Sequence, residues 1–142
     1  MITCHIHVAE PQDADVLLAL ASGFATSFVV DGAAFQTAFS ALLADRDAHL
    51  LVAEQDAHLV GYLLGFVHAS FYANGPVAWV EEITVAENLR RHGIGQLLMQ
   101  QFERWAATRD ARLVALATRR AVPFYQALGY EESAIYLRKL LS

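Results

Sequence analysis

Residues 79–99 constrain the fold of this chain most, because their pattern changes from strand to helix across a short glycine-bearing turn. Residues 79–85 are rich in β-formers (Trp79, Val80, Ile83, Thr84, Val85). After the turn, apolar residues recur at the i, i+3, i+4 spacing of an amphipathic helix (Ile94, Leu97, Leu98, Phe102, Trp105). The segment therefore predicts a strand that ends at Val85, then a loop, then a helix over 94–108.

The predicted loop has the features of an anion-binding turn. Unpaired N–H groups and the positive end of the helix dipole attract an anion at a helix N-terminus. Gly93 and Gly95 would let a ligand approach the main chain without meeting a Cβ. The spacing rejects a Walker loop, because no lysine precedes Lys139. It also rejects a dinucleotide fingerprint, because Leu98 stands where the third glycine would be.

The rest of the chain predicts a single mixed α/β domain over 1–142. Strands are expected over 2–9, 49–54, 59–71, 77–85, 112–117 and 134–138, and helices just after Asp13 and over 33–44, 94–108 and 121–128. The turn Asn74-Gly75-Pro76 predicts that the strand over 77–85 is antiparallel to the one before it. The apolar run over 112–117 suits a buried strand parallel to 77–85, joined to it by a right-handed crossover.

Composition excludes several classes of protein. With 142 residues, 56% hydrophobic and 18% charged, one ordered domain is expected. No apolar run is long enough for a membrane span, and no secretory signal is recognised, so we expect no membrane partner. The lone cysteine, Cys4, fits a reducing cytoplasm, which is the expected location. The histidines are scattered, so no metal site is expected.

Charge is distributed unequally along the chain, whose formal net charge is −5. Residues 1–80 carry eight acids and one base, whereas residues 81–142 carry seven acids and nine bases. The positive half contains the proposed loop, as an anionic cofactor would favour. No basic, aromatic-laced surface predicts nucleic-acid binding.

Two motifs resemble signatures of a known family. The sequence Arg90-x-x-Gly93-x-Gly95 is similar to the acyl-coenzyme-A loop of the GCN5-related N-acetyltransferases (the GNAT family), which reads Arg/Gln-x-x-Gly-x-Gly/Ala. Residues 124–130, Phe-Tyr-Gln-Ala-Leu-Gly-Tyr, resemble the family's second signature, Phe-Tyr-x-x-Leu-Gly-Phe/Tyr. The resemblance covers about residues 49–130.

The resemblance implies a fold and a reaction. The fold would be a mixed sheet of six to seven strands, mostly antiparallel with a central parallel pair, flanked by about four helices. The reaction would be direct transfer of acetyl from acetyl-CoA to a primary amine of a small molecule or peptide in a ternary complex. The family places the acceptor pocket near the N-terminal third, which makes Phe24, Phe28 and Phe35 candidate pocket walls.

The resemblance also assigns residues to acetyl-CoA. The strand end at Ile83, Thr84 and Val85 would hydrogen-bond the pantetheine arm like an added strand. The loop would cradle the pyrophosphate, mainly through main-chain N–H groups (Arg90, Arg91, His92, Gly93, Ile94, Gly95, Gln96). Thr118 stands where family members often carry an asparagine that bonds the cofactor.

Two catalytic residues follow from the same resemblance. Glu81 is the expected general base, acting through a water, and Tyr125 the expected general acid for the departing thiolate. Because side chains alternate across a strand, only one of Glu81 and Glu82 is expected to face the acceptor groove.

Two other functions stay open: an acyl-CoA-binding module without transfer, and a purely structural dimerising domain. Homodimerisation could use the edge of the closing strand over 134–138. The identity of the acceptor amine stays open as well.

Overall fold

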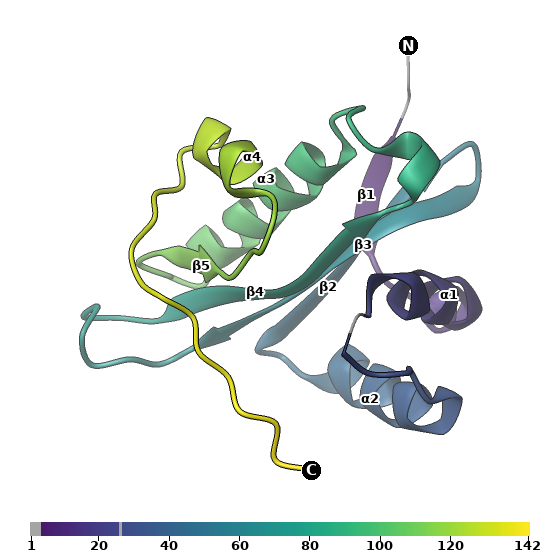
Figure 1. Cartoon of the computed structure of the whole chain (residues 1–142), viewed down its shortest axis with the longest axis horizontal. Helices are drawn as coiled ribbons and strands as arrows, with labels where there is room; N and C mark the ends of the chain where they lie inside the picture. The colour runs from purple at the N-terminus through teal and green to yellow at the C-terminus, as the bar shows by residue number, and fades with distance from the viewer. Residues whose placement is uncertain (1–3, 26) are drawn as a thin grey trace.

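The computed structural model describes residues 4–25 and 27–142, and these form one open sheet with helices on both faces (Figure 1). The elements follow the chain as β1 His5–Val8, α1 Ala14–Phe24, α2 Gly32–Ala44, β2 Ala48–Gln55, β3 His58–His68, β4 Val77–Val85, α3 Ile94–Thr108, β5 Val114–Leu116 and α4 Val122–Ala127. The bounds of β4 and α3 are those expected from the sequence. Residues 2 and 3 of the expected first strand lie outside the described residues.

The strand order in the sheet is β1-β2-β3-β4-β5. Neighbours are antiparallel except β4 and β5, which run parallel and pair over Ala78–Val114, Trp79–Ala115 and Val80–Leu116. Helix α3 joins these two strands, so the expected β4–α3–β5 crossover is confirmed. The mostly antiparallel sheet with one parallel pair is therefore confirmed as well.

Two cores cover the two faces of the sheet. On one face, the buried side of α3 (Ile94, Leu98, Met99, Phe102, Ala106) packs against β2, β3 and β4. On the other face, α1 and α2 contribute Leu17 and Phe39 to a core with Val52, Tyr62 and Leu64. Figure 1 shows this division, with α3 and α4 on one side of the sheet and α1 and α2 on the other.

The described sheet has five strands rather than six to seven, and its parallel pair lies at an edge rather than at the centre. The expected closing strand over 134–138 is wrong, because residues 128–142 contain no helix or strand. Gly129, at φ +97°, reverses the chain after α4. The chain then crosses in front of β4 instead of running beside β5 (Figure 1). The strand edge proposed for homodimerisation is therefore missing.

No helix among the described residues is long and apolar enough to span a membrane.

Candidate functional site

The loop between β4 and α3 presents main-chain N–H groups at the start of a 15-residue helix. Gly93 lies in the left-handed region, at φ +83°, and occupies the N-cap position of α3. No side chain caps this end in the described structure, and the first i to i+4 bond is donated by Leu97 to the Gly93 carbonyl. The N–H groups of Ile94, Gly95 and Gln96 therefore precede the helical ladder and can bind an anion.

Each loop glycine has its own physical reason. A Cβ at Gly93 would meet no heavy atom within 4 Å, so this glycine is required for its positive φ rather than for space. A Cβ at Gly95 would lie 3.2 Å from Cζ of Phe124, on α4. Gly95 therefore lets the first turn of α3 lie closely against α4. The loop thus brings the first signature motif into contact with the second.

The basic side chains of the loop differ in what they contact. The Arg90 Nε donates to the Val85 carbonyl over 3.1 Å, which braces the loop against the end of β4. Arg91 and His92 are exposed, and Arg91 has a positive φ of 68°. Of the three basic residues expected to bind the cofactor, Arg90 thus already donates to the main chain from its Nε.

Beyond Val80, the edge of β4 that faces β5 lies outside the pairing with β5. The β3 ladder continues on the other edge, through Leu63–Ile83, Tyr62–Thr84 and Gly61–Val85. The strand end named from the sequence, residues 83–85, therefore has one edge in the sheet and one edge beyond it. An extended chain could add there by strand-like hydrogen bonding.

A β-bulge changes where the two adjacent carboxylates lie. Val80 is in register with Gly65, and Glu82 with Leu64, so Glu81 is the extra residue on β4. Both Val80 and Ile83 pack in the core beneath α3, with the two glutamates between them. The expectation that strand alternation separates the two glutamates is wrong, because the bulge breaks that alternation.

Both carboxylates accept hydrogen bonds from aromatic side chains of the face that α1 and α2 cover. The Tyr62 hydroxyl donates to Glu82 Oε1 over 2.7 Å, and Tyr62 belongs to the core under α1 and α2. The Trp79 Nε1 donates to Glu81 Oε1 over 3.2 Å. Trp79 is in register with Phe66, which packs against the same core. Glu81 is exposed, whereas Glu82 is half-buried.

The Tyr62 hydroxyl is a constant hydrogen-bond donor to the Glu82 carboxylate. The Tyr62 side chain is only 3% exposed. Burial raises the pKa of the Tyr62 phenol first, and the neighbouring Glu82 charge and hydrogen bond raise it further. The hydroxyl therefore stays protonated and can donate throughout the neutral range. Neither Tyr62 nor Trp79 was identified from the sequence, since their pairing with the glutamates depends on strand register and on the bulge.

Tyr125 lies on α4 and packs into the core beneath α3. The Phe124 and Tyr130 rings meet its ring at near-perpendicular angles of 76° and 73°. Burial raises the pKa of its phenol, so the hydroxyl is protonated at neutral pH and can serve as a proton donor. Tyr130, the last residue of the second motif, donates from its own hydroxyl to Glu103 Oε2 over 2.6 Å, which ties the end of that motif to α3.

Thr118 lies just before α4. Its Oγ1 accepts from the Ala121 amide over 3.1 Å, so this side chain shapes the turn that starts the helix. Among the described residues, Glu81 and Tyr125 share no hydrogen bond, so the structure does not bring these two side chains together directly. What it does bring together is the α3 N-terminus with α4, and the two glutamates with Trp79 and Tyr62.

A cavity of about 400 Å³ lies at the connection between α1 and α2. It is lined by Ser22, Ala25, Ser27, Phe28, Val29 and Val30. Of the three aromatic residues expected as pocket walls, Phe28 lines this cavity. Phe35 instead stacks on Phe39, at 5.7 Å between ring centroids, and packs against the core.

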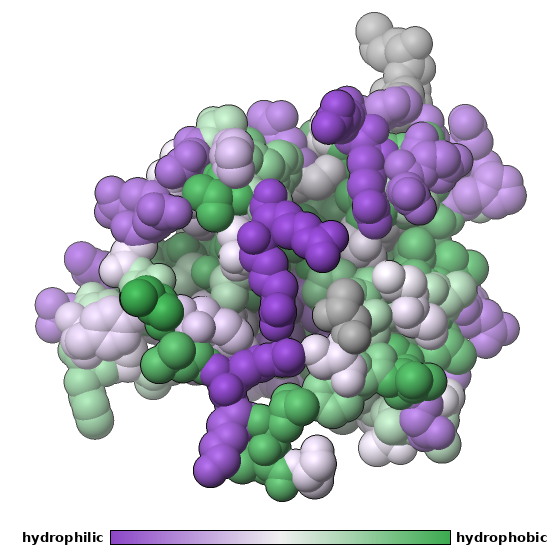
Figure 2. Space-filling model, in the orientation of Figure 1, coloured by the Kyte–Doolittle hydropathy of each residue, from purple (hydrophilic) through white to green (hydrophobic). Residues whose placement is uncertain are grey.

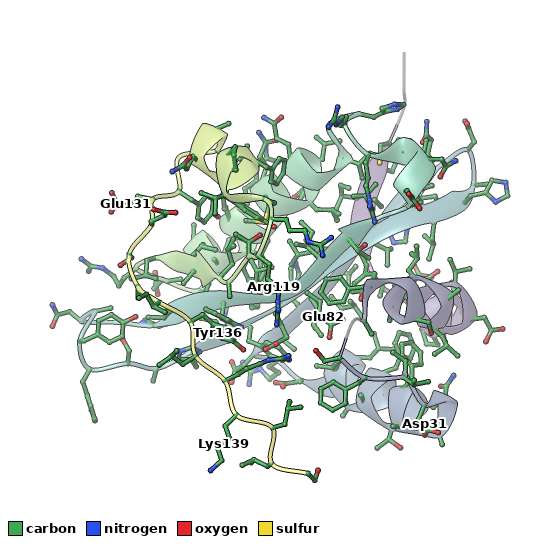
Figure 3. All side chains as sticks on the ribbon, viewed as in Figure 1. Asp31, Glu82, Arg119, Glu131, Tyr136 and Lys139 are labelled. Carbon is green, nitrogen blue, oxygen red and sulfur yellow. The ribbon has the colours of Figure 1, made fainter. Side chains whose placement is uncertain are left out.

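Figure 3 shows the side chains around the two glutamates. Glu82 lies on the sheet, Arg119 lies above it in this view, from the segment before α4, and Tyr136 lies in front of β4. Within residues 4–25 and 27–142, no three His, Cys, Asp or Glu side chains gather in a group that could hold a metal ion.

Comparisons with known proteins place this geometry in context. A sequence model of the acetyltransferase (GNAT) family matches residues 17–130. An aminoglycoside N(6')-acetyltransferase type 1 from Acinetobacter genomosp. 13 is 38% identical over 78 residues, which is 48% of this chain and 53% of that protein. The match thus spans about half the length of that curated relative.

Solved structures show the same fold at low sequence identity. Glucosamine-6-phosphate N-acetyltransferase from Arabidopsis thaliana superposes with a TM-score of 0.87 at 17% identity, over 99% of both chains. The aminoglycoside acetyltransferase AAC(6')-Iy, bound to the bisubstrate analog CoA-S-monomethyl-acetylneamine, gives a TM-score of 0.82 at 20% identity, over 97% of this chain and 99% of that one.

Proposed function

The chain belongs to the GNAT family of acetyltransferases, and we propose that it transfers acetyl from acetyl-CoA to a primary amine of a small molecule or peptide. The amine attacks the thioester directly, in a ternary complex of enzyme and both substrates. One observation carries this proposal: the uncapped N-terminus of α3 lies beside the open end of β4. The structurally similar AAC(6')-Iy has been solved with a bisubstrate analog, which supports direct attack in a ternary complex.

The residues present fit acetyl-CoA as co-substrate. The main chain at Ile83, Thr84 and Val85 would bond the pantetheine arm along the edge that β5 leaves open. The N–H groups from Arg91 to Gln96 would hold the pyrophosphate at the positive end of the α3 dipole. Thr118 would add a bond near the start of α4, and Arg91 and His92 are exposed for the phosphates.

Glu81 is proposed as the general base. It would take the ammonium proton through a water, because it is exposed on the face where the acceptor is expected and is oriented by the Trp79 N–H. Glu82 is the competing candidate on the same bulge, and its carboxylate is held by Tyr62. Exchanging each glutamate for glutamine separates them: Glu81→Gln should lower kcat and flatten the acid limb of the pH profile. An unchanged profile removes Glu81 from this role.

Tyr125 is proposed as the general acid. Its buried, protonated hydroxyl would donate to the thiolate as CoA departs. The acetyl group then forms an amide with the acceptor nitrogen, the thioester bond breaks, and the thiolate leaves as a thiol.

The acceptor is proposed to be a small-molecule amine or a peptide amine. This proposal is supported by the names of two similar proteins, an aminoglycoside acetyltransferase and a glucosamine-6-phosphate acetyltransferase. Those acceptors belong to the similar proteins themselves. A reducing cytoplasm is the proposed location, since Cys4 has no second cysteine to pair with. Homodimerisation also stays a proposal, which light scattering on the purified chain would test.

Calorimetry with CoA, followed by a CoA-release assay across a panel of amines, tests the function. We expect heat with CoA and thiol release with at least one amine. Heat without release from any amine would favour the alternative, an acyl-CoA-binding module. The absence of heat at millimolar CoA would refute both.

A further inference from the structure

Residues 131–142, here called the C-terminal strap, form an extended segment that crosses the face of the sheet carrying the two glutamates. Figure 1 shows the strap in yellow, following α4, passing in front of β4 and ending at the bottom of the view, below and to the left of α2. All of its residues are exposed, and Ile135, Leu137 and Leu141 are 87%, 85% and 93% exposed. The apolar side chains of the strap therefore do not anchor it to a core.

Within the described part of the chain, one aromatic stack and one side-chain hydrogen bond join the strap to the rest of the structure. The Tyr136 ring stacks on the Trp79 ring of β4, with 6.4 Å between centroids and 21° between planes. Two residues later, the Arg138 Nη2 donates to the Ser27 Oγ over 2.8 Å. One contact is on the sheet and the other on the α1–α2 connection, next to the 400 Å³ cavity that Ser27 lines. The strap thus spans both walls of the face where the acceptor is expected.

The first of these contacts continues to the proposed base. The Trp79 side chain has one polar atom, Nε1, and this atom donates to Glu81 Oε1. The direction of that N–H depends on the plane of the indole ring, and Tyr136 packs on that plane. Tyr136, Trp79 and Glu81 therefore form a continuous series of contacts from the strap to a carboxylate.

We propose that the C-terminal strap positions the Glu81 carboxylate: Tyr136 holds the plane of Trp79, and the Trp79 N–H orients Glu81. This inference rests on the proposed function, in which Glu81 receives the ammonium proton. Tyr136 and Trp79 are positioning residues, because they act through Glu81. Glu82 provides the contrast, because it is held by Tyr62 from the core under α1 and α2, whereas the donor to Glu81 is the ring on which Tyr136 stacks.

Four variants separate positioning from general structural damage. Tyr136→Ala removes the stack, Tyr136→Phe keeps it, and Trp79→Phe keeps the ring but removes the N–H. The double variant combines Tyr136→Ala with Trp79→Phe. Since small displacements of a catalytic group are costly, Tyr136→Ala and Trp79→Phe should each lower kcat by about tenfold. The KM for acetyl-CoA should stay unchanged, and Tyr136→Phe should be close to wild type.

The double variant gives the sharpest result. If Tyr136 acts through Trp79, the double variant should have the same kcat as Trp79→Phe alone. In Trp79→Phe the N–H that orients Glu81 is already absent, so removing Tyr136 cannot misplace it further. Tyr72→Ala is the matched control, since Tyr72 is a 75% exposed tyrosine in the β3–β4 connection, and in the described structure the aromatic stack and the hydrogen bond of the strap go to Trp79 and Ser27 instead.

Fluorescence follows the stack independently of turnover. The chain has two tryptophans, so a Trp105→Phe background leaves Trp79 as the only tryptophan, whose emission can be excited selectively. Adding Tyr136→Ala should shift its emission toward that of a solvated indole, and adding Tyr72→Ala should not.

The outcomes distinguish this inference from the function on which it rests. A wild-type chain that transfers acetyl to no amine refutes the proposed function and this inference together. A wild-type chain that does transfer acetyl, alongside a Tyr136→Ala variant of equal kcat, overturns the positioning role alone. A double variant whose loss of kcat equals the product of the two single losses would also overturn the positioning role. The same holds for a Tyr136→Ala variant that loses CoA binding in calorimetry.

Discussion

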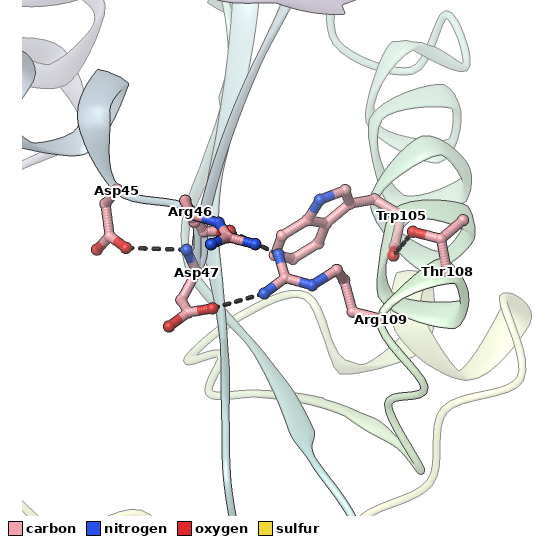
Figure 4. Close-up of polar contacts among 6 residues, drawn as sticks. All are labelled: Asp45, Arg46, Asp47, Trp105, Thr108 and Arg109. Carbon is pink, nitrogen blue, oxygen red and sulfur yellow. Dashed lines mark hydrogen bonds and ion pairs between the residues drawn. The ribbon is translucent and has the colours of Figure 1, made fainter.

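His49 makes the stability of this protein dependent on pH in the mildly acidic range. It lies at the start of β2 with its ring parallel to the indole of Trp105, at 4.5 Å between centroids and 1° between planes. Arg109 lies 5.3 Å from the same indole and binds Asp47 and the Arg46 carbonyl (Figure 4). Burial, and then the Arg109 charge, lower the pKa of His49 from 6.5 to about 4.

The sign follows from the depressed pKa. Between pH 6.5 and pH 4 the unfolded chain binds a proton at His49 that the folded chain does not, so the stability falls as the pH falls through this window. At pH 5 a single group with these two pKa values would remove about 2 kcal/mol of the free energy of unfolding relative to pH 7.5. Because His49 is only partly buried, solvent screening should reduce this to about 1 kcal/mol.

Urea unfolding at pH 7.5, 6.0 and 5.0 measures the effect. His49→Phe keeps an aromatic ring against Trp105 but removes the titrating group, so its stability should fall by about 1 kcal/mol less than that of wild type over this range. His58→Gln is the control, since His58 is exposed at the start of β3 and its loss should leave the slope as in wild type. Equal slopes for wild type and His49→Phe would refute the reasoning.

Three further changes test the site and the core. Gly93→Val should raise the KM for acetyl-CoA by about tenfold or more in steady-state kinetics, because φ +83° strains a β-branched residue. Gly32→Ala is the control and should leave this KM unchanged, because a Cβ there meets no atom within 4 Å. Gly65→Ala should lower the free energy of unfolding by about 3 kcal/mol in urea titrations, because its Cβ would lie 2.3 Å from Cε1 of the fully buried Phe102. A loss under about 1 kcal/mol would mean that the Phe102 ring can move to make room. Tyr125→Phe should lower kcat more than tenfold with the KM for acetyl-CoA unchanged, and a smaller loss in a stopped assay of CoA release would argue against proton donation.

Much of the fold could be predicted because its signals are local. The β-formers up to Val85, a glycine at φ +83° and the apolar period after Ile94 define β4, the loop and α3, and each depends only on neighbours in the chain. The parallel strand β5 could be predicted from the same kind of signal. A strand, a helix and a second apolar run in that order are typical of two parallel strands joined by a right-handed crossover. The family, too, could be identified from two short motifs.

The candidate site was less predictable where it depends on residues distant in sequence. The bulge at Glu81 exists only in the register of β4 against β3, so alternation along β4 gave the wrong arrangement of the two glutamates. Tyr62, Trp79 and Tyr136 carry no motif, and their relation to those glutamates arises from the packing of separate strands and the strap.

The C-terminal segment shows the division most clearly. Its residues have a strand-like composition, and the sequence alone predicted a closing strand over 134–138. Whether such a segment forms a strand depends on an edge within reach, and after Gly129 the chain is directed across β4 rather than along β5. Local composition determined where β4, α3 and the glycine turn lie, because backbone preferences are properties of neighbouring residues. Only the tertiary structure decided which aromatic side chains hold Glu81 and Glu82, because those contacts join residues that no local pattern relates.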